Sequence, residues 1–174
     1  MTILSAQTVR RYCKMFRLVE PFHERTVANG KTYGLSSAGY DVRIDLPNKY
    51  PDSEMMPDEL RGYTPCIFLQ RHSYRLASTL ERFNMPKNVM GIVHDKSSWA
   101  RKGVCVQNTV IEPGWCGFLT LEITNHGDES QIIKPGDAIA QIVFHFLDEQ
   151  TEQPYTGKYQ NQMPGPQPAI EETS

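Results

Sequence analysis

The pattern of hydrophobic and polar positions divides the chain into one short helix and many short strands. Few helix-breaking residues interrupt Ala6–Met15, and Ser5 stands where a capping residue is expected, so this segment is predicted to be helical. After Gly30, turn-forming residues recur and β-prone runs lie between them. These runs predict strands over Tyr40–Ile44, Cys66–Leu69, Tyr74–Thr79, Val89–Val93, Val104–Val106, Phe118–Thr124, Gln131–Ile133 and Ile139–Phe146.

Short strands at this spacing favour an all-β sandwich or barrel. The polar, proline-containing segment Asn48–Tyr63 is expected to be a long loop. From Thr151 onward the chain is rich in proline, glutamine and glycine, and such a composition cannot form a core of its own. We therefore predict one β domain over residues 1–150, followed by a tail over 151–174 that is mobile or becomes ordered on a partner.

Length and composition narrow the class of protein. A chain of 174 residues with 39% hydrophobic residues is large enough for one well-packed domain. The net charge of −2 argues against a nucleic-acid polymer as partner, because such proteins carry a basic surface. No apolar run is long enough to cross a membrane, and the first residues do not form a secretory signal. We expect a cytoplasmic protein.

The cysteines do not form a metal-binding pattern. Cys13, Cys66, Cys105 and Cys116 contain no C-x-x-C pair and no histidine at zinc-ligand spacing, so we expect four free thiols, mostly buried. Zinc-dependent nucleobase deaminases need an H-x-E or C-x-E motif followed by P-C-x-x-C. Pro65-Cys66 lacks the second cysteine and no H-x-E occurs. A deaminase with this sequence would have to activate water without zinc.

Glu122 is the first candidate for chemistry. Strict alternation along its strand places it on one face with Phe118, Thr120 and Thr124, opposite Leu119, Leu121 and Ile123. Most strand glutamates are simply solvated. If this face is covered instead, burial would raise the pKa of the Glu122 carboxyl toward the range that suits proton transfer.

The turn Lys96–Arg101 is the second candidate. If it is helical, Ser97 and Arg101 lie on one face, and with Lys96 and free N–H groups they could hold an anion. The alternative is an exposed loop that binds nothing. Asp95 is poorly placed for a phosphate site and is expected to cap the turn through Ser98.

Three further features allow two interpretations each. Trp115, in the turn that begins at Glu112, is expected to pack rather than to stack on a base. Gln141 interrupts a hydrophobic strand, so it is either a satisfied core amide or a hydrogen-bonding group for a ligand. The segment Tyr155–Gln162 could close over a nucleotide with Lys158 toward a phosphate, although its composition is also that of a disordered tail.

In combination, these residues resemble the deoxycytidine triphosphate deaminase family, which is related to the trimeric dUTPases. The resemblance covers most of the chain. It rests on the start MTILSAQTVRR, on Val19–Phe22, on Tyr33–Arg43, on the whole of residues 94–125, and on the order K-S-S-x-x-R, E-P-G-W, T-L-E and G-K-Y-x-x-Q. No one of these motifs is specific alone, but their order is.

The resemblance implies a distorted jelly-roll subunit of the dUTPase kind and a homotrimer whose active sites lie between subunits. It implies that dCTP and water give dUTP and ammonia, which supplies dUMP and dTTP synthesis. Magnesium would be bound through the triphosphate, with no metal ligand on the protein, and dTTP is a possible inhibitor. A dUTPase, a bifunctional enzyme that forms dUMP, a deaminase of dCMP or of a modified dCTP, and a non-enzymatic nucleotide sensor remain alternatives.

By position, Glu122 corresponds to the family's catalytic glutamate, and Ser97 and Arg101 to the residues that hold and polarise the water. Glu112 matches a sugar contact, where many members have aspartate after a loop two residues longer than Val104–Ile111. The other matched residues are those of the nucleotide-binding turn, the base-side backbone and the closing segment: Lys96, Ser97, Ser98, Trp99, Ala100, Arg101, Thr120, Leu121, Gln141, Tyr155, Lys158 and Gln162.

Overall fold

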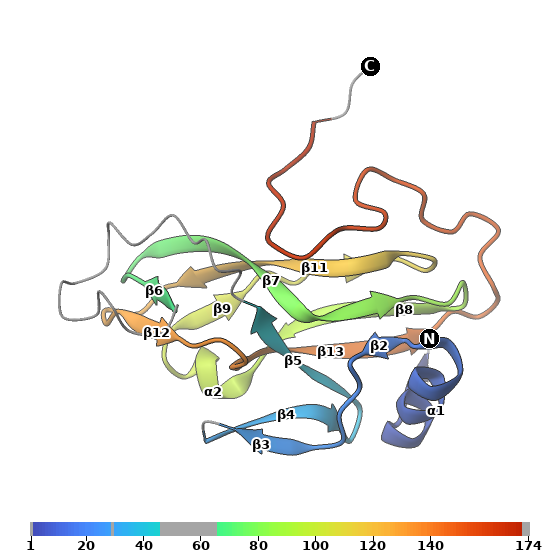
Figure 1. Cartoon of the computed structure of the whole chain (residues 1–174), viewed down its shortest axis with the longest axis horizontal. Helices are drawn as coiled ribbons and strands as arrows, with labels where there is room; N and C mark the ends of the chain where they lie inside the picture. Colours follow the sequence, from blue (N-terminus) through green and yellow to red (C-terminus); the bar gives the residue numbers. More distant parts are fainter. Residues whose placement is uncertain (1, 29, 46–65, 172–174) are drawn as a thin grey trace.

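The computed structural model describes residues 2–28, 30–45 and 66–171, and most of their regular structure is β-strand (Figure 1). The prediction of a mainly β fold with a short N-terminal helix is confirmed. The expected loop Asn48–Tyr63 lies outside the described residues.

One mixed-length antiparallel sheet forms the body of the molecule. Its central path runs in the order β10-β8-β13-β5-β7-β11-β9, so strands far apart in sequence lie side by side. The predicted strands all form, and apart from β7 they differ from the prediction by at most two residues at each end. The strands of this path are β5 (Gly39–Asp45), β7 (Ser73–Asn84), β8 (Val89–Asp95), β9 (Val104–Val106), β10 (Val110–Ile111), β11 (Cys116–Asn125) and β13 (Ala138–Phe146).

Shorter elements surround this path. Helix α1 (Ala6–Phe16) begins where it was predicted, but the Ser5 hydroxyl lies 3.3 Å from that of Thr8 and does not cap a backbone N–H. A separate two-stranded sheet joins β12 to β6. The elements that the sequence pattern did not show as strands are the shortest or most polar ones. The remaining elements are β1 (Thr2–Ile3), β2 (Val19–Glu20), β3 (Thr26–Ala28), β4 (Lys31–Ser36), β6 (Ile67–Leu69), α2 (Ser97–Ala100) and β12 (Gln131–Ile133).

Strand β7 runs five residues beyond the predicted end at Thr79. The prediction stopped short because the strand carries a buried charged residue, which interrupts the hydrophobic pattern. Glu81 is fully buried, yet it accepts hydrogen bonds of 2.8 Å from the backbone N–H and 2.7 Å from Nε of Arg43. A buried carboxylate needs such partners. From sequence alone, Glu81 looks like the end of a strand rather than part of its buried face.

The register between β7 and β11 is irregular beside the candidate site. Phe118 pairs with Arg82 and Thr120 with Ser78, so three residues of β7 lie opposite Leu119 alone. The Leu119 N–H donates to the Thr79 hydroxyl at 2.9 Å. The prediction that Leu119 faces away from Glu122 is therefore wrong: the irregularity turns Leu119 into the same cavity.

Candidate functional site

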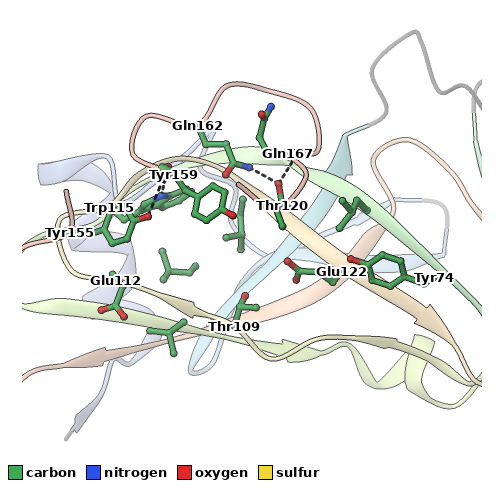
Figure 2. Close-up of a pocket in the computed structure, with 15 residues that line it drawn as sticks. Tyr74, Thr109, Glu112, Trp115, Thr120, Glu122, Tyr155, Tyr159, Gln162 and Gln167 are labelled. Carbon is green, nitrogen blue, oxygen red and sulfur yellow. Dashed lines mark hydrogen bonds between the residues drawn. The ribbon is translucent and has the colours of Figure 1, made fainter. Parts of the chain in front are cut away.

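A cavity of about 350 Å³ lies between β11, the segment that leads into β10, and the C-terminal segment (Figure 2). Most of its wall is aromatic or aliphatic, and a few polar groups point into it. This is the usual composition of a small-molecule site. The residues that line it include Tyr74, Thr109, Glu112, Trp115, Leu119, Thr120, Glu122, Tyr155, Tyr159 and Gln162.

Glu122 is the acid of this cavity. Its carboxyl group points into the open space, and its Oε2 is buried without a hydrogen-bond partner among the described residues. Burial raises the pKa of the Glu122 carboxyl above its ordinary value, and a hydrogen bond with its own backbone opposes that rise. Of the two interpretations of Glu122, a solvated or a covered carboxylate, the structure shows a partly covered one, and such a group suits proton transfer near neutral pH.

Tyr74 lies beside Glu122 and was not singled out from the sequence. It lies on β7 next to the strand of Glu122, and Figure 2 shows its hydroxyl directed toward the carboxyl group. Burial, and then the charge of Glu122, raise the pKa of the Tyr74 phenol. Tyr74 therefore stays neutral at physiological pH. In the sequence, the period-2 alternation identifies Tyr74 only as a strand residue.

The C-terminal segment forms the roof of the cavity. Gln162 makes an isolated parallel bridge with Gly117, and the Phe118 N–H donates to the Gln162 carbonyl at 3.0 Å. The Thr120 hydroxyl accepts hydrogen bonds from Gln162 Nε2 at 2.5 Å and from the Gln167 N–H at 3.0 Å (Figure 2). The tail thus has partners on its own chain, and the remaining prediction is that a nucleotide orders it further.

Trp115 binds the C-terminal segment that covers the cavity. It is 5% exposed, packs on Phe83 with ring centroids 6.4 Å apart, and donates from Nε1 to the Tyr159 carbonyl at 2.8 Å. The Tyr155 N–H donates to the Pro113 carbonyl at 2.8 Å, so the turn before β11 holds the tail. The predicted packing role of Trp115 is confirmed, and its edge also lines the cavity.

The predicted nucleotide-binding turn forms a helical turn, but elsewhere on the molecule. In α2, the Arg101 N–H donates to the Ser97 carbonyl at 3.2 Å, and the side chains of Ser97, Ser98, Ala100 and Arg101 are exposed. Figure 1 shows α2 on the side of the sheet opposite the C-terminal segment. None of residues 96–101 lines the cavity that holds Glu122. A single chain therefore does not bring these two groups together.

Trp99 in the turn and Asp95 before it have structural partners that the sequence did not predict. Trp99 is 2% exposed and donates from Nε1 to the Ala138 carbonyl at 2.8 Å, so its side chain anchors α2 in the core. Asp95 does not cap the turn through Ser98, as was expected. Its Oδ1 accepts the Val106 N–H at 2.7 Å instead, and the cap position belongs to Lys96.

Lys96 and Gln141 meet at one buried carboxylate. Lys96 Nζ lies 2.5 Å from Asp41 Oδ2, and Gln141 Nε2 donates to Asp41 Oδ1 and to the Ser36 hydroxyl, each at 3.2 Å. The two charged side chains are only 11% and 10% exposed. Gln141 is therefore a satisfied amide, and it lies behind the turn rather than in the cavity.

The structure thus divides the predicted residues into two groups. Glu112, Thr120, Glu122, Tyr155 and Gln162 line the cavity. The side chain of Leu121 is fully buried in the core, and Lys158 is exposed on the tail, with Nζ 5.6 Å from the Tyr159 ring centroid. Lys96 to Arg101 and Gln141 form the second group around α2.

Comparison with known proteins identifies the family of this chain. A family model described as dCTP deaminase-like matches residues 3–147. A dCTP deaminase of Albidiferax ferrireducens is 35% identical over 94% of this chain and 96% of its own, and one of Neisseria meningitidis is 32% identical over 93% and 96%. The chain belongs to the dCTP deaminase-like family.

Solved structures support the fold of this family member. The dCTP deaminase from Agrobacterium tumefaciens superimposes with a TM-score of 0.61 at 15% identity, over 83% of this chain and 48% of that one. A dUTPase mutant from phage phi11 of S. aureus gives 0.50 at 16% identity, over 82% and 95%. The predicted dUTPase-like fold is confirmed.

The described part of this dCTP deaminase-like chain contains no group of three or more histidine, cysteine, aspartate or glutamate side chains placed to share a metal ion. Its four cysteines are free, as predicted, but only Cys13 is buried, so the expectation that most are buried is wrong. Within the described residues, no helix has both the length and the apolar character needed to span a membrane.

Proposed function

We propose that this protein is a dCTP deaminase that converts dCTP and water to dUTP and ammonia. The observation that carries the proposal is the half-buried carboxyl group of Glu122. Burial raises its pKa, and its Oε2, which has no hydrogen-bond partner among the described residues, faces a cavity that the C-terminal segment covers. The names of the relatives support this substrate. Because dCTP is a metabolite of the cell interior, we expect the enzyme to act in the cytoplasm.

The reaction needs one group that both accepts and donates protons. Water attacks C4 of cytosine while Glu122 takes one of its protons and delivers it to N3. Glu122 then takes the proton of the new hydroxyl and passes it to the leaving amine, so that ammonia departs and the carbonyl forms. A carboxyl group whose pKa lies near the working pH performs both steps. The apolar wall around Glu122 excludes bulk water and strengthens these interactions.

The turn around α2 would complete the site from a second subunit. Ser97 and Arg101 are exposed and oriented outward, and the cavity of the same chain does not contain them. In a homotrimer with active sites between subunits, Arg101 and Ser97 of one chain would orient the water beside Glu122 of another. Ser98 would lie near the phosphates, and Glu112 at the edge of the cavity would meet the sugar. The phosphate role expected of the Lys96 side chain does not fit its nearly buried ion pair with Asp41.

Magnesium fits this site as an ion that arrives on the nucleotide. The described residues offer no cluster of three carboxylates for it, and triphosphate oxygens and water are its usual ligands. When bound, it would neutralise phosphate charge. Lys158 lies exposed on the tail and would approach the same phosphates, whereas Lys96 is nearly buried against Asp41. The related nucleotide dTTP would compete for the site.

The decisive experiment is to incubate the purified protein with dCTP, dCMP and dUTP, and to resolve the products by ion-exchange chromatography. The expected result is dUTP and ammonia from dCTP. If dUMP and pyrophosphate accumulate instead, the protein is a dUTPase or a bifunctional enzyme. Turnover of dCMP alone would show that the triphosphate is not the substrate.

Glu122→Gln tests the role of Glu122 in proton transfer, because it preserves the shape of the side chain and removes the titratable proton. Deamination should fall by about two orders of magnitude or more while dCTP still binds. Glu129→Gln changes an exposed glutamate outside the cavity and serves as the control. Near-normal turnover by Glu122→Gln would show that Glu122 is not the proton shuttle.

A further inference from the structure

The cavity contains a second buried polar atom without a partner, in addition to the carboxyl oxygen of Glu122. The hydroxyl oxygen of Thr109 has no hydrogen-bond partner among the described residues. Figure 2 shows this hydroxyl pointing up into the cavity, from the side opposite the roof, toward the space that Glu122 also faces. An unpartnered buried polar atom costs free energy in the folded state, so it needs an explanation.

The backbone holds Thr109 in this position from both sides. The Gln107 N–H donates to the carbonyl of Glu122 at 2.9 Å, and the Val93 N–H donates to the carbonyl of Thr109 at 3.0 Å. The short segment between β9 and β10 is thus fixed to β11 at one point and to β8 at the other. Thr109 is held next to Glu122 by contacts that do not involve its side chain.

The other polar groups of the cavity already have partners or lie at its edge. The Thr120 hydroxyl accepts two hydrogen bonds from the tail, and Gln162 donates one of them. The Tyr155 hydroxyl accepts from the Tyr159 N–H at 3.1 Å. Glu112 is exposed. Among the residues that the structure describes, Thr109 and Glu122 are therefore the two that contribute buried oxygens without a hydrogen-bond partner to this cavity.

We propose that Thr109 recognises the base of the nucleotide, and that its hydroxyl accepts a hydrogen bond from the 4-amino group of cytosine. This inference rests on the proposed function, in which Glu122 acts at N3 and C4. Because Thr109 faces the same space as Glu122, its hydroxyl would lie beside the substituent on C4. A hydroxyl both accepts and donates, so it pairs with the amino group of the substrate and with the carbonyl of the product.

The test uses a ligand that lacks the group in question. In a Glu122→Gln background, which prevents turnover, calorimetry measures the affinity for dCTP and for the 2-pyrimidinone deoxynucleoside triphosphate, which has hydrogen in place of the 4-amino group. Adding Thr109→Val should weaken dCTP binding about tenfold and leave the analogue within about twofold. Adding Thr109→Ser, which preserves the hydroxyl, should recover most of the affinity for dCTP.

Two measurements separate recognition from a structural effect. Thr109→Val replaces an unpartnered hydroxyl by a methyl group, so the melting temperature without ligand should stay the same or rise. Thr124→Val is the matched control, because the Thr124 hydroxyl already contacts His126 at 3.0 Å and does not line the cavity. That control should leave dCTP affinity unchanged.

The outcomes distinguish a failure of the role of Thr109 from a failure of the proposed deaminase function. If the unaltered protein deaminates dCTP but Thr109→Val weakens neither ligand, or weakens both equally, the role of Thr109 is overturned and the deaminase proposal stands. If the unaltered protein neither deaminates nor binds dCTP, both fail. Selective loss of dCTP binding with recovery by Thr109→Ser supports the assignment.

Discussion

Gln162 of the tail donates a 2.5 Å hydrogen bond to the hydroxyl of Thr120, two residues before Glu122 on the same strand. The closing segment is therefore attached to the strand that carries the acid. Thr120 and Gln162 were both expected to bind the nucleotide, but the hydrogen bond between them was not predicted. It couples the position of the roof to the wall of the cavity.

The first prediction concerns this contact. Gln162→Ala removes the hydrogen bond to Thr120, so the tail should detach more often. Lys158 is the trypsin site of this segment, and its cleavage should become several-fold faster. Trp115 should emit at longer wavelength as Tyr159 leaves its Nε1. Gln150→Ala, at an exposed position before the tail, is the control. Equal cleavage rates in both variants would contradict the coupling.

The second prediction concerns pH and stability. Burial raises the folded-state pKa of Glu122 above its unfolded value. Its contribution to stability is therefore fully present below the unfolded pKa and is lost as the pH rises through the folded pKa. Glu122→Gln avoids this loss, so the variant should melt about 1–2 °C higher than the parent at pH 8, a small shift because the side chain is partly exposed.

The same comparison at low pH provides the check. The difference in melting temperature should shrink toward zero near pH 4, where the parent carboxyl is neutral in both states. Glu129→Gln should show no such trend, since its side chain is exposed. A difference that stays constant with pH, or one of opposite sign, would mean that Glu122 is not destabilised by its own charge.

The third prediction concerns the ion pair behind α2. Asp41 and Lys96 are nearly buried, so Asp41→Asn leaves an uncompensated ammonium group. Urea unfolding should show a loss of about 3 kcal/mol. Asp41→Asn combined with Lys96→Met should recover most of that loss, because no charge remains buried. If the double variant is less stable than Asp41→Asn, the two side chains do not form a single energetic unit.

Sequence reasoning succeeded where a residue's neighbours in the chain decide its environment. The alternation around Glu122 predicted its strand but left open whether its face is covered, and the turn residues predicted the segment before Trp115. Sequence reasoning failed where segments distant in the sequence determine the environment of a residue. Glu81 is buried because Arg43 meets it, and Leu119 faces the cavity because β7 slips in register. Thr109 has no local pattern that marks its hydroxyl as unpartnered.

The fourth prediction concerns metal. If protein groups alone activate the water, a zinc chelator followed by added magnesium should leave the deaminase rate unchanged. Elemental analysis should find less than stoichiometric zinc in the purified protein. One tightly bound zinc per chain, whose removal abolishes turnover, would contradict a mechanism based on Glu122, Ser97 and Arg101.

The fifth prediction concerns assembly, because one chain separates Glu122 from Arg101. Glu122→Gln and Arg101→Ala should each be inactive, since each lacks one half of every site. When the two are unfolded together, mixed in equal amounts and refolded, about one quarter of the parent rate should return if the proposed homotrimer forms. A site of that trimer works only where an intact Glu122 meets an intact Arg101 from a neighbour.

Two controls make this mixing experiment decisive. Each variant refolded alone must remain inactive, and sedimentation must show that the mixture and the parent have the same trimeric mass. Refolding Glu122→Gln with a chain that carries both substitutions should restore nothing, because no intact Glu122 is present. If the equal mixture stays inactive while its trimers are intact, Glu122 and Arg101 do not act in one site across a subunit boundary, and the turn around α2 has another role.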